Sequence, residues 1–338
     1  MSIDLSPLAG TPRLLFAVPL RPLQGQRFQP TGFPGLGAAT FQTASGTSLL
    51  VESAQSMANR LESTCWNEAV NGLRPEFDGI SHVVIKQRCA FLTDTILEAH
   101  RLNSPYLLGG KDKGFLDLLQ KELGVLEAGP IDRRKLAATL LKYDIGSLLH
   151  GIFLAKKDLA GGRLRLARAM SAFIEADGVR VAASGGVKND HVHPGKVEGD
   201  PKSHFGNIPF ARDEYTADRI TLYVNIDLGQ IRGYGLGADV ENLLTVLALY
   251  KLRLLLDGSL RLRTACDLEP ATETIVATRP KDFVLPDSGA LQAAVASAIF
   301  ICKDKMIVTE VAFNDELKKA KESESSERAE VDSDDDGV

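Results

Sequence analysis

The chain has 338 residues, of which 44% are hydrophobic and 25% are charged, and its formal net charge is −5 at pH 7. This length and apolar content suffice for one elaborated globular domain or two ordinary ones. The four cysteines, Cys65, Cys89, Cys266 and Cys302, are scattered and form no CxxC pair, which argues against a zinc ribbon and against a disulfide-rich scaffold.

The N-terminus has no basic region followed by a long apolar run, and no uncharged apolar stretch is long enough to span a bilayer. We therefore expect no signal peptide and no membrane contact. Reduced thiols are the expectation for such a chain, and with them a cytoplasmic location.

Charge is unevenly distributed along the chain. Residues 315–338 contain ten of the 44 acidic residues and four of the 39 basic ones, which leaves 34 acids and 35 bases, a net of +1, in the remainder. An acidic overall balance therefore does not exclude an RNA-binding face. We predict one domain over 1–314 and a disordered acidic tail over 315–338.

The N-terminal half mixes strands, turns and helices. A strand-like run at 14–20 precedes a Gly-, Pro- and Gln-rich stretch over 22–46, which predicts a long loop. Apolar residues at helical spacing then predict a helix over 48–67. The elements expected next, in chain order, are a strand at 82–86, a helix over 92–102, a turn at 103–105, and helices over 114–123 and 133–143.

The C-terminal half is richer in strands. Its expected elements, in chain order, are strands at 148–154, 172–174 and 179–183, a glycine loop, a polar excursion over 194–214, a strand at 221–228, a helix over 240–256 that Gly258 ends, strands at 260–263 and 274–277, a helix over 288–300 and a strand at 306–311. These elements follow no regular βα repeat. We therefore predict an α+β fold, not a Rossmann sheet or a barrel.

The segment from Ser184 to Pro194 is the most unusual in composition, because it combines two glycines, a lysine, amide or carboxylate side chains and two histidines. Gly185 and Gly186 would let the backbone approach a ligand, and Lys188 and Asn189 would donate to phosphate. Two alternatives stay open at this point. One is an ordinary turn or bulge, and the other is a metal site made of His191 and His193 with Asp190 or His204.

A second candidate surface is the polar face of the helix expected over 48–67. Gln55 and Asn59 lie one turn apart, with Ser56 and Arg60 one step round the helix. Amides, hydroxyls and one arginine suit contact with a sugar–phosphate chain. An ordinary solvated helix face is the alternative.

Basic residues elsewhere form a third group. Arg261 and Arg263 alternate on an expected strand and therefore share a face, and Arg232 lies in a Gly- and Tyr-containing segment that suits stacking and close backbone approach. Surface charges and an ordinary glycine-rich turn are the alternatives. The chain has no GxSxG elbow, no Walker A sequence and no HExxH motif. We therefore expect no enzyme activity, no bound cofactor and no metal.

Five segments together resemble a known family. They are Val51–Glu62, Ser184–Asp190, Asn207–Thr216, Asp227–Gly235 and Leu260–Leu268. They resemble, in order, motifs of the backbone subunit of the type I-G (formerly I-U) CRISPR surveillance complex, a RAMP-superfamily protein of the Cascade type.

The resemblance implies a modified RRM (ferredoxin-like) palm with inserted finger and thumb segments, for which 103–145 and 194–214 are the candidates. It implies that copies of the chain polymerise along a crRNA, as part of antiviral defence. Its other implied partners are the target DNA strand, the large subunit, the guide-processing or end-capping subunit, and a recruited helicase-nuclease. In such a complex the protein holds the guide by its backbone, and base pairing reads the sequence.

The RNA-contacting residues expected on this basis are Gln55, Ser56, Asn59, Arg60, Gly185, Gly186, Lys188, Asn189, Arg232, Arg261 and Arg263. Two other classes of function stay open. One is a metal-dependent RNA endonuclease of the same superfamily that uses Asp190, and the other is a scaffold that contacts only protein.

Overall fold

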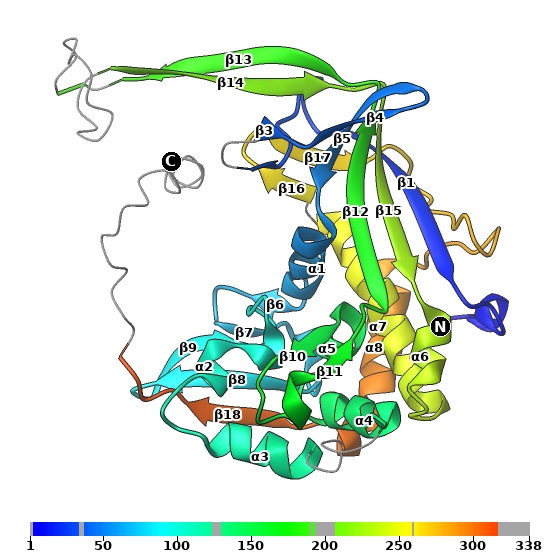
Figure 1. Ribbon diagram of the computed structural model, residues 1–338. Helices are drawn as coiled ribbons and strands as arrows, with labels where there is room; N and C mark the ends of the chain where they lie inside the picture. Colours follow the sequence, from blue (N-terminus) through cyan, green and yellow to red (C-terminus); the bar gives the residue numbers. More distant parts are fainter. Residues whose placement is uncertain are drawn as a thin grey trace.

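The computed structural model describes residues 3–33, 37–123, 130–189, 191–192, 207–258 and 260–316, and its main layer is a seven-stranded antiparallel sheet (Figure 1). The strand order is β16-β17-β1-β15-β12-β5-β4. The strands are β1 (Leu14–Pro22), β4 (Thr40–Thr43), β5 (Gly46–Glu52), β12 (Met170–Asp177), β15 (Arg219–Ile226), β16 (Leu260–Arg263) and β17 (Cys266–Pro270).

Alternating side chains of the central strands form one wall of the core. Leu14, Phe16 and Val18 of β1 are buried and their neighbours are not, because successive residues of a strand face opposite sides of the sheet. β15 pairs with β1 on one side and with β12 on the other. The sheet therefore has one apolar face that needs a covering layer.

Three helices supply that layer. α1 (Ala54–Ser63) contacts β12 and α7 (Ala238–Gly258), and α8 (Ser288–Cys302) packs on α7. α7 is mostly buried because its apolar residues surround the helix, with Leu243, Leu247 and Tyr250 among them. No helix in the described part of the chain is long and apolar enough to cross a membrane.

A second lobe lies at the end of these helices, in the lower part of Figure 1. It contains a three-stranded sheet in which β18 (Val308–Ala312) runs parallel to β8 (His82–Gln87), and β9 (Ala90–Asp94) is antiparallel to β8. The elements around it are α2 (Pro105–Leu108), α3 (Gly114–Leu123), α4 (Arg133–Tyr143), α5 (Gly146–His150), and the β10 (Ile152–Leu154) and β11 (Leu164–Leu166) hairpin.

The shorter elements connect these layers. They are η1 (Ser6–Leu8), β2 (Gly32–Phe33), β3 (Gly37–Ala38), β6 (Trp66–Asn67), β7 (Gly72–Leu73), η2 (Pro75–Phe77), η3 (Arg101–Asn103), η5 (Ala160–Gly162), α6 (Leu228–Gly233) and η6 (Lys303–Lys305).

A two-stranded ribbon projects from the main sheet and runs along the top of Figure 1. It is formed by β13 (Arg180–Lys188) and β14 (Ile208–Thr216), which pair from Arg180↔Thr216 to Lys188↔Ile208. Its register is in phase with that of β12 and β15, where Asp177 pairs with Arg219. The register of the two central strands therefore continues into the ribbon, which bends away from them at the joint that contains Gly178, a residue with a φ of 63° (Figure 1).

The α+β class predicted from the sequence is confirmed. Strands predicted at 14–20, 82–86, 172–174, 221–228, 260–263 and 306–311 and helices predicted over 114–123, 133–143, 240–256 and 288–300 all occur, with ends that differ by a few residues. The stretch 22–46, expected to be a loop, also contains the short strands β2, β3 and β4.

The helix predicted over 48–67 is wrong in its first part. Residues 46–52 form β5, which pairs with β12, and the helix begins only after Ser53. The Ser53 hydroxyl accepts a hydrogen bond from the Ser56 backbone N–H at 3.2 Å, so it caps the helix. The apolar residues of 48–52 therefore belong to a strand and not to the helical stripe.

The helix predicted over 92–102 is also wrong. β9 runs to Asp94, whose carboxylate accepts a hydrogen bond from the Ile96 backbone N–H at 2.9 Å and so turns the chain. The predicted strand at 148–154 is half wrong, since α5 occupies 146–150 and β10 begins only after Gly151. The segment 274–277 forms an isolated bridge, Val276↔Val284, not a strand.

The predicted glycine loop is a strand. Gly185 and Gly186 lie within β13, opposite Ala211 and Phe210 of β14. A Cβ on Gly185 would lie 2.5 Å from the Phe210 carbonyl oxygen. The glycines therefore allow the partner strand to approach. Strand pairing accounts for their presence without a bound ligand.

Candidate nucleic-acid interface

The first turns of α1 present polar side chains at the surface. The Gln55 side-chain amide donates to Asn59 Oδ1 at 3.2 Å, and the Arg168 guanidinium donates to Gln55 Oε1. Gln55 is exposed, whereas Ser56 and Asn59 are partly buried. Met57 and Leu61 on the opposite side of the helix are buried in the core, so the polar face of α1 is held outward.

Arg60 and Arg263 connect α1 and β5 to the edge strand β16. Arg60 donates to the Arg261 and Leu262 carbonyl oxygens at 3.2 and 2.7 Å. The Arg263 guanidinium donates to the Gln29 carbonyl at 3.0 Å and to the Glu52 carboxylate. Both guanidinium groups therefore hold the strand in place, while Arg261 on the same strand is exposed.

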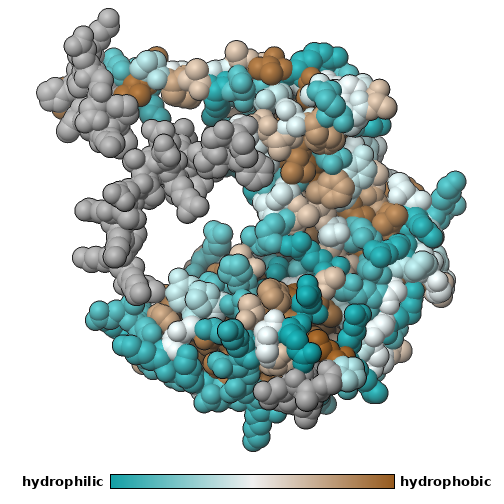
Figure 2. Space-filling view, viewed as in Figure 1, coloured by the Kyte–Doolittle hydropathy of each residue, from teal (hydrophilic) through white to brown (hydrophobic). Residues whose placement is uncertain are grey.

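The residues predicted around the glycines lie on the ribbon. Lys188 and Asn189 are exposed at its far end, beyond Gly185 and Gly186. The apolar side chains of Val181, Val187 and Phe210 are 61%, 51% and 38% exposed. Figure 2 shows brown patches along the ribbon, and mostly hydrophilic residues on the visible face of the lobe below it.

Arg232 lies on α6, where its guanidinium donates to the Thr11 carbonyl oxygen. Two neighbours on this helix face a cavity instead. Gln230 donates to the Ala167 carbonyl at 2.7 Å and to Tyr234 Oη at 2.8 Å, and Tyr234 Oη donates to the Leu148 carbonyl at 2.7 Å. Burial raises the pKa of Tyr234 to about 12, so this phenol is a permanent hydrogen-bond donor at neutral pH.

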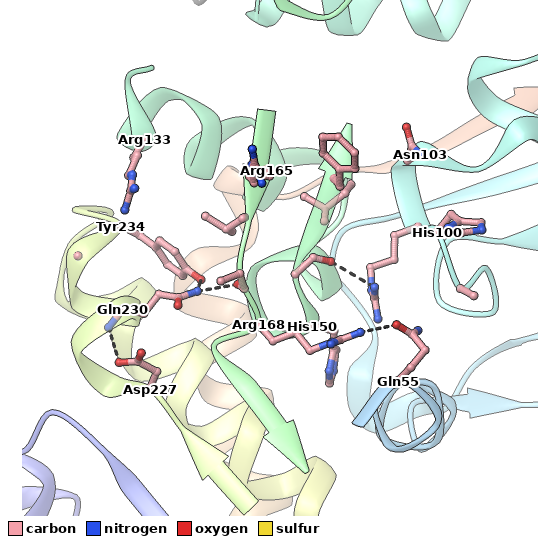
Figure 3. A pocket seen from close by; sticks show the side chains of 18 of the residues that line it. Gln55, His100, Asn103, Arg133, His150, Arg165, Arg168, Asp227, Gln230 and Tyr234 are labelled. Atoms are coloured by element: carbon pink, nitrogen blue, oxygen red, sulfur yellow. Dashed lines mark hydrogen bonds between the residues drawn. The ribbon is translucent and has the colours of Figure 1, made fainter. Parts of the chain in front are cut away.

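The cavity has a volume of about 1030 Å³ and lies between the start of α1, the β10–β11 hairpin and α6 (Figure 3). Gln55 forms part of its wall, so the cavity is continuous with the polar face of α1. Four arginines line it, against one carboxylate, that of Asp227. They are Arg101, Arg133, Arg165 and Arg168.

Buried charges support the wall of the cavity. Arg101 donates to both carboxylate oxygens of Glu62 and, at 3.2 Å, to the Gly151 carbonyl. Burial raises the pKa of Glu62 to about 6, against the opposing effect of Arg101. Lys251 Nζ lies 3.2 Å from His150 Nε2, and burial together with the nearby cations lowers the pKa of His150 well below its usual value.

The structure brings some predicted residues together and leaves others apart. Arg60 on α1 lies beside Arg261 and Arg263 through the contacts described above, whereas Gln55 and Asn59 contact each other on the same helix. The ribbon residues and Arg232 belong to other parts of the fold. Arg133, Arg168, Gln230 and Tyr234 were missed as site residues, although Gln230 and Tyr234 flank the Arg232 that the sequence indicated.

Most of the residues proposed for a metal site lie outside the described part of the chain. They are Asp190, His193 and His204. Most of the excursion 194–214 and the tail from 317 onward also lie outside the described residues. Among the described residues, no group of three or more His, Cys, Asp or Glu residues is placed to hold a metal ion.

Residues 14–181 match the model of a protein family described as "CRISPR-associated protein GSU0053 (Cas_GSU0053)". The match extends from β1 to the start of the ribbon and supports the CRISPR association that the sequence motifs predicted. No curated protein matches the chain. Among solved structures, a chain of a "CRISPR RNA-guided surveillance complex, pre-nicking" is similar with 13% sequence identity and a TM-score of 0.35, over 71% of this chain and 68% of that one.

Proposed function

We propose that this chain is a crRNA-binding subunit of a Cascade-type CRISPR surveillance complex and that copies of it polymerise along the guide. The observation that carries this proposal is the match of residues 14–181 to a CRISPR-associated family, over the part of the chain that contains the polar face of α1 and most of the arginine-lined cavity. The subtype suggested by the sequence motifs, type I-G, is part of the proposal.

The order of the sheet supports an RRM-like palm. β1, α1, β12, β15, α7 and β17 follow one another along the chain, and their strands lie in the order β17-β1-β15-β12. This is the βαββαβ arrangement of ferredoxin-like domains. β5 and β4 extend the sheet beyond β12, and the lower lobe apart from β18 is inserted between α1 and β12.

We assign the thumb to the ribbon of β13 and β14. It is inserted between two palm strands, and it includes part of the 194–214 segment predicted as one candidate. An isolated two-stranded hairpin is at best marginally stable in water, and this ribbon exposes Val181, Val187 and Phe210. A neighbouring copy in a filament would cover these side chains.

The guide is expected to be held by its backbone. The arginines of the cavity and the donors of α1 suit phosphate and ribose oxygens, and phosphate contacts carry no sequence information. Base edges would then stay available to a target DNA strand. The large subunit, an end-capping subunit and a helicase-nuclease would be the other partners of such a particle.

The test is the salt dependence of RNA binding by the full-length protein. We compare Arg133→Ala/Arg165→Ala with a control, Arg21→Ala/Arg219→Ala, which removes two exposed arginines that each pair with one carboxylate outside the cavity. If both cavity arginines contact phosphate, the slope of log K against log salt falls by about 1.4, or about 0.7 for each contact on a single strand. The control keeps the wild-type slope.

Two unrelated RNA sequences are used in parallel, and the loss is expected to be equal for both. Particle mass, measured by light scattering, should rise in steps as the RNA is lengthened. Failure of the wild-type protein to bind RNA at low ionic strength would refute the proposal. A loss restricted to one of the two sequences would refute backbone recognition.

A further inference from the structure

The last residues of the sequence form a run of acidic side chains. Residues 329–338, called the acidic segment from here on, contain five carboxylates and no base, whereas residues 317–328 contain three acids and four bases. The five acids are Glu330, Asp332, Asp334, Asp335 and Asp336. In an extended chain, consecutive aspartates place one charge about every 3.3–3.6 Å, close to the phosphate spacing of about 3.4 Å along one strand of duplex DNA. The aspartate run therefore has about the linear charge density of a nucleic-acid strand.

The charge balance of the arginine-lined cavity favours an anion. Among the described residues, Arg101 is paired with Glu62, and the single lining carboxylate, Asp227, is paired with a further arginine at 2.9 Å. Arg133 and Arg165 are exposed and pair with no carboxylate in the described part of the chain. The mouth of the cavity therefore carries positive charge that these residues do not compensate.

Two buried donors in the wall of the cavity lack an acceptor among the described residues, namely Arg168 Nε and His150 Nδ1. A lysine ammonium has only donors, so His150 Nε2 must accept from Lys251, and the proton of the neutral ring then sits on Nδ1. Buried donors without acceptors cost free energy. Carboxylate oxygens brought into the cavity would reduce this cost after a small movement of the wall.

The described part of the chain ends on the lower lobe, which also carries the β10–β11 hairpin of the cavity wall. Asp315 is held there, because its carboxylate accepts a hydrogen bond from the Lys111 backbone N–H at 3.2 Å and its carbonyl accepts one from Gln87 Nε2 at 2.7 Å. The 12 residues 317–328 that precede the acidic segment span up to about 40 Å when extended. A compact chain of this length has a radius of gyration of about 20 Å, so the acidic segment is able to reach the cavity.

We propose that the acidic segment docks in the arginine-lined cavity of its own chain and occupies it until a nucleic-acid strand displaces it. Its carboxylates accept from Arg133 and Arg165 at the mouth and from Arg168 in the wall. The competition with a strand rests on the proposed function, whereas the docking itself needs no RNA. A tethered competitor has a high effective concentration and weakens the binding of every strand by the same factor. Strands of low affinity are then left unbound, while a guide with many contacts still loads.

Disulfide trapping in the full-length protein tests the docking without RNA. Gly337→Cys is combined with Ala167→Cys, at an exposed position that lines the cavity, and the exposed Cys89 is replaced by serine. Two tail variants, each with three charges removed, are compared in this background. The aspartate variant is Asp334→Asn/Asp335→Asn/Asp336→Asn, and its matched control, the glutamate variant, is Glu322→Gln/Glu324→Gln/Glu327→Gln.

The disulfide should form about 5-fold or more slowly in the aspartate variant than with the unaltered tail, because docking raises the local concentration of the tail thiol. Removing negative charge beside that thiol favours its thiolate, so this effect alone would speed the reaction. The glutamate variant should keep the rate of the unaltered tail. Equal rates in the aspartate variant and the unaltered tail would overturn the proposal.

RNA binding by the two tail variants, without the added cysteines, tests the competition. If the acidic segment occupies the cavity for half to nine tenths of the time, it raises the apparent dissociation constant about 2- to 10-fold. The aspartate variant should therefore bind a short RNA more tightly by about this factor at low ionic strength, and the glutamate variant should not. Equal strengthening by both variants would indicate repulsion at a distance and would overturn the docking.

Arg133→Ala/Arg165→Ala connects both measurements to the cavity. In this background the aspartate variant should no longer strengthen RNA binding, and trapping should be slow with either tail. An unchanged gain would place the action of the tail elsewhere and overturn the proposal. If the wild type binds RNA but the aspartate variant changes neither measurement, the docking is refuted and the proposed function stands. If the wild type binds no RNA while trapping still depends on the aspartates and on the cavity arginines, the docking stands and the proposed function is refuted.

Discussion

Replacing Gly185 with alanine is expected to break the pairing of the ribbon at one point. A Cβ at this position would lie 2.5 Å from the Phe210 carbonyl oxygen and 3.2 Å from the Ala211 Cα, both of which are backbone atoms of β14. Backbone atoms cannot rotate away as a side chain does. The two strands must therefore separate locally by several tenths of an ångström.

The cost should be about 1–3 kcal/mol, which is typical when an extra methyl group is forced into a filled space. The strand residues around Gly185 are exposed, so no second layer resists the separation. We therefore expect the cost to appear as easier opening of the ribbon and not as lower stability of the core.

Hydrogen exchange of backbone amides measures this effect directly. Protection in residues 183–188 and 208–213 should fall about 5- to 150-fold, which corresponds to 1–3 kcal/mol. Amides of β1 and β15 should keep their protection, and the thermal midpoint should stay close to that of the wild type. β1 and β15 form the centre of the sheet and lie outside the ribbon, so the substitution does not touch them.

Gly186→Ala is the matched control for this experiment. Its Cβ would lie 3.3 Å from the edge of the Phe210 ring, which can rotate away at small cost. It adds the same methyl group one residue further along the strand. Equal loss of protection in the two variants, or unchanged protection in Gly185→Ala, would refute the argument that β14 approaches β13 through this glycine.

Two further predictions concern buried charges. Arg101→Met should lower the free energy of unfolding by about 3–5 kcal/mol in urea titrations, because it leaves the buried Glu62 carboxylate without its partner, and Arg101→Met/Glu62→Met should recover much of this loss. The contribution of His150 to the free energy of unfolding should fall as pH drops below about 6.5, by up to about 1.4 kcal/mol for each pH unit, since the unfolded chain binds a proton that buried His150 does not. His150→Gln should remove that component, and identical pH profiles of unfolding would contradict it.

Local patterns in the sequence predicted much of the fold. The helices over 114–123 and 133–143 and the strand at 82–86 were found because each has a clear period and a clear end. The errors lie where tertiary contacts decide. Val51 falls in the helical spacing of the apolar residues that follow it, but residues 48–52 pair with β12 in the sheet, and only the cap at Ser53 marks the change.

The candidate site was less accessible to sequence analysis. α1 was identified from its spacing of amides, but Arg60 and Arg263 are joined to carbonyl groups from β16 and from Gln29, and their partners are far away in the chain. The cavity combines residues from α1, the β10–β11 hairpin and α6. Each of the lining arginines alone resembles an ordinary surface charge, so only the fold reveals that they share one wall.

The in-phase register between the main sheet and the ribbon has a consequence for evolution and for engineering. Because Asp177↔Arg219 and Arg180↔Thr216 are three residues apart on both strands, the pairing register of the ribbon is inherited from that of β12 and β15. Insertions of the same even number of residues in both strands would lengthen the arm without turning it over. One residue added to each strand at the joint would instead exchange its two faces, and a contact surface built there would point the wrong way although the core had not changed.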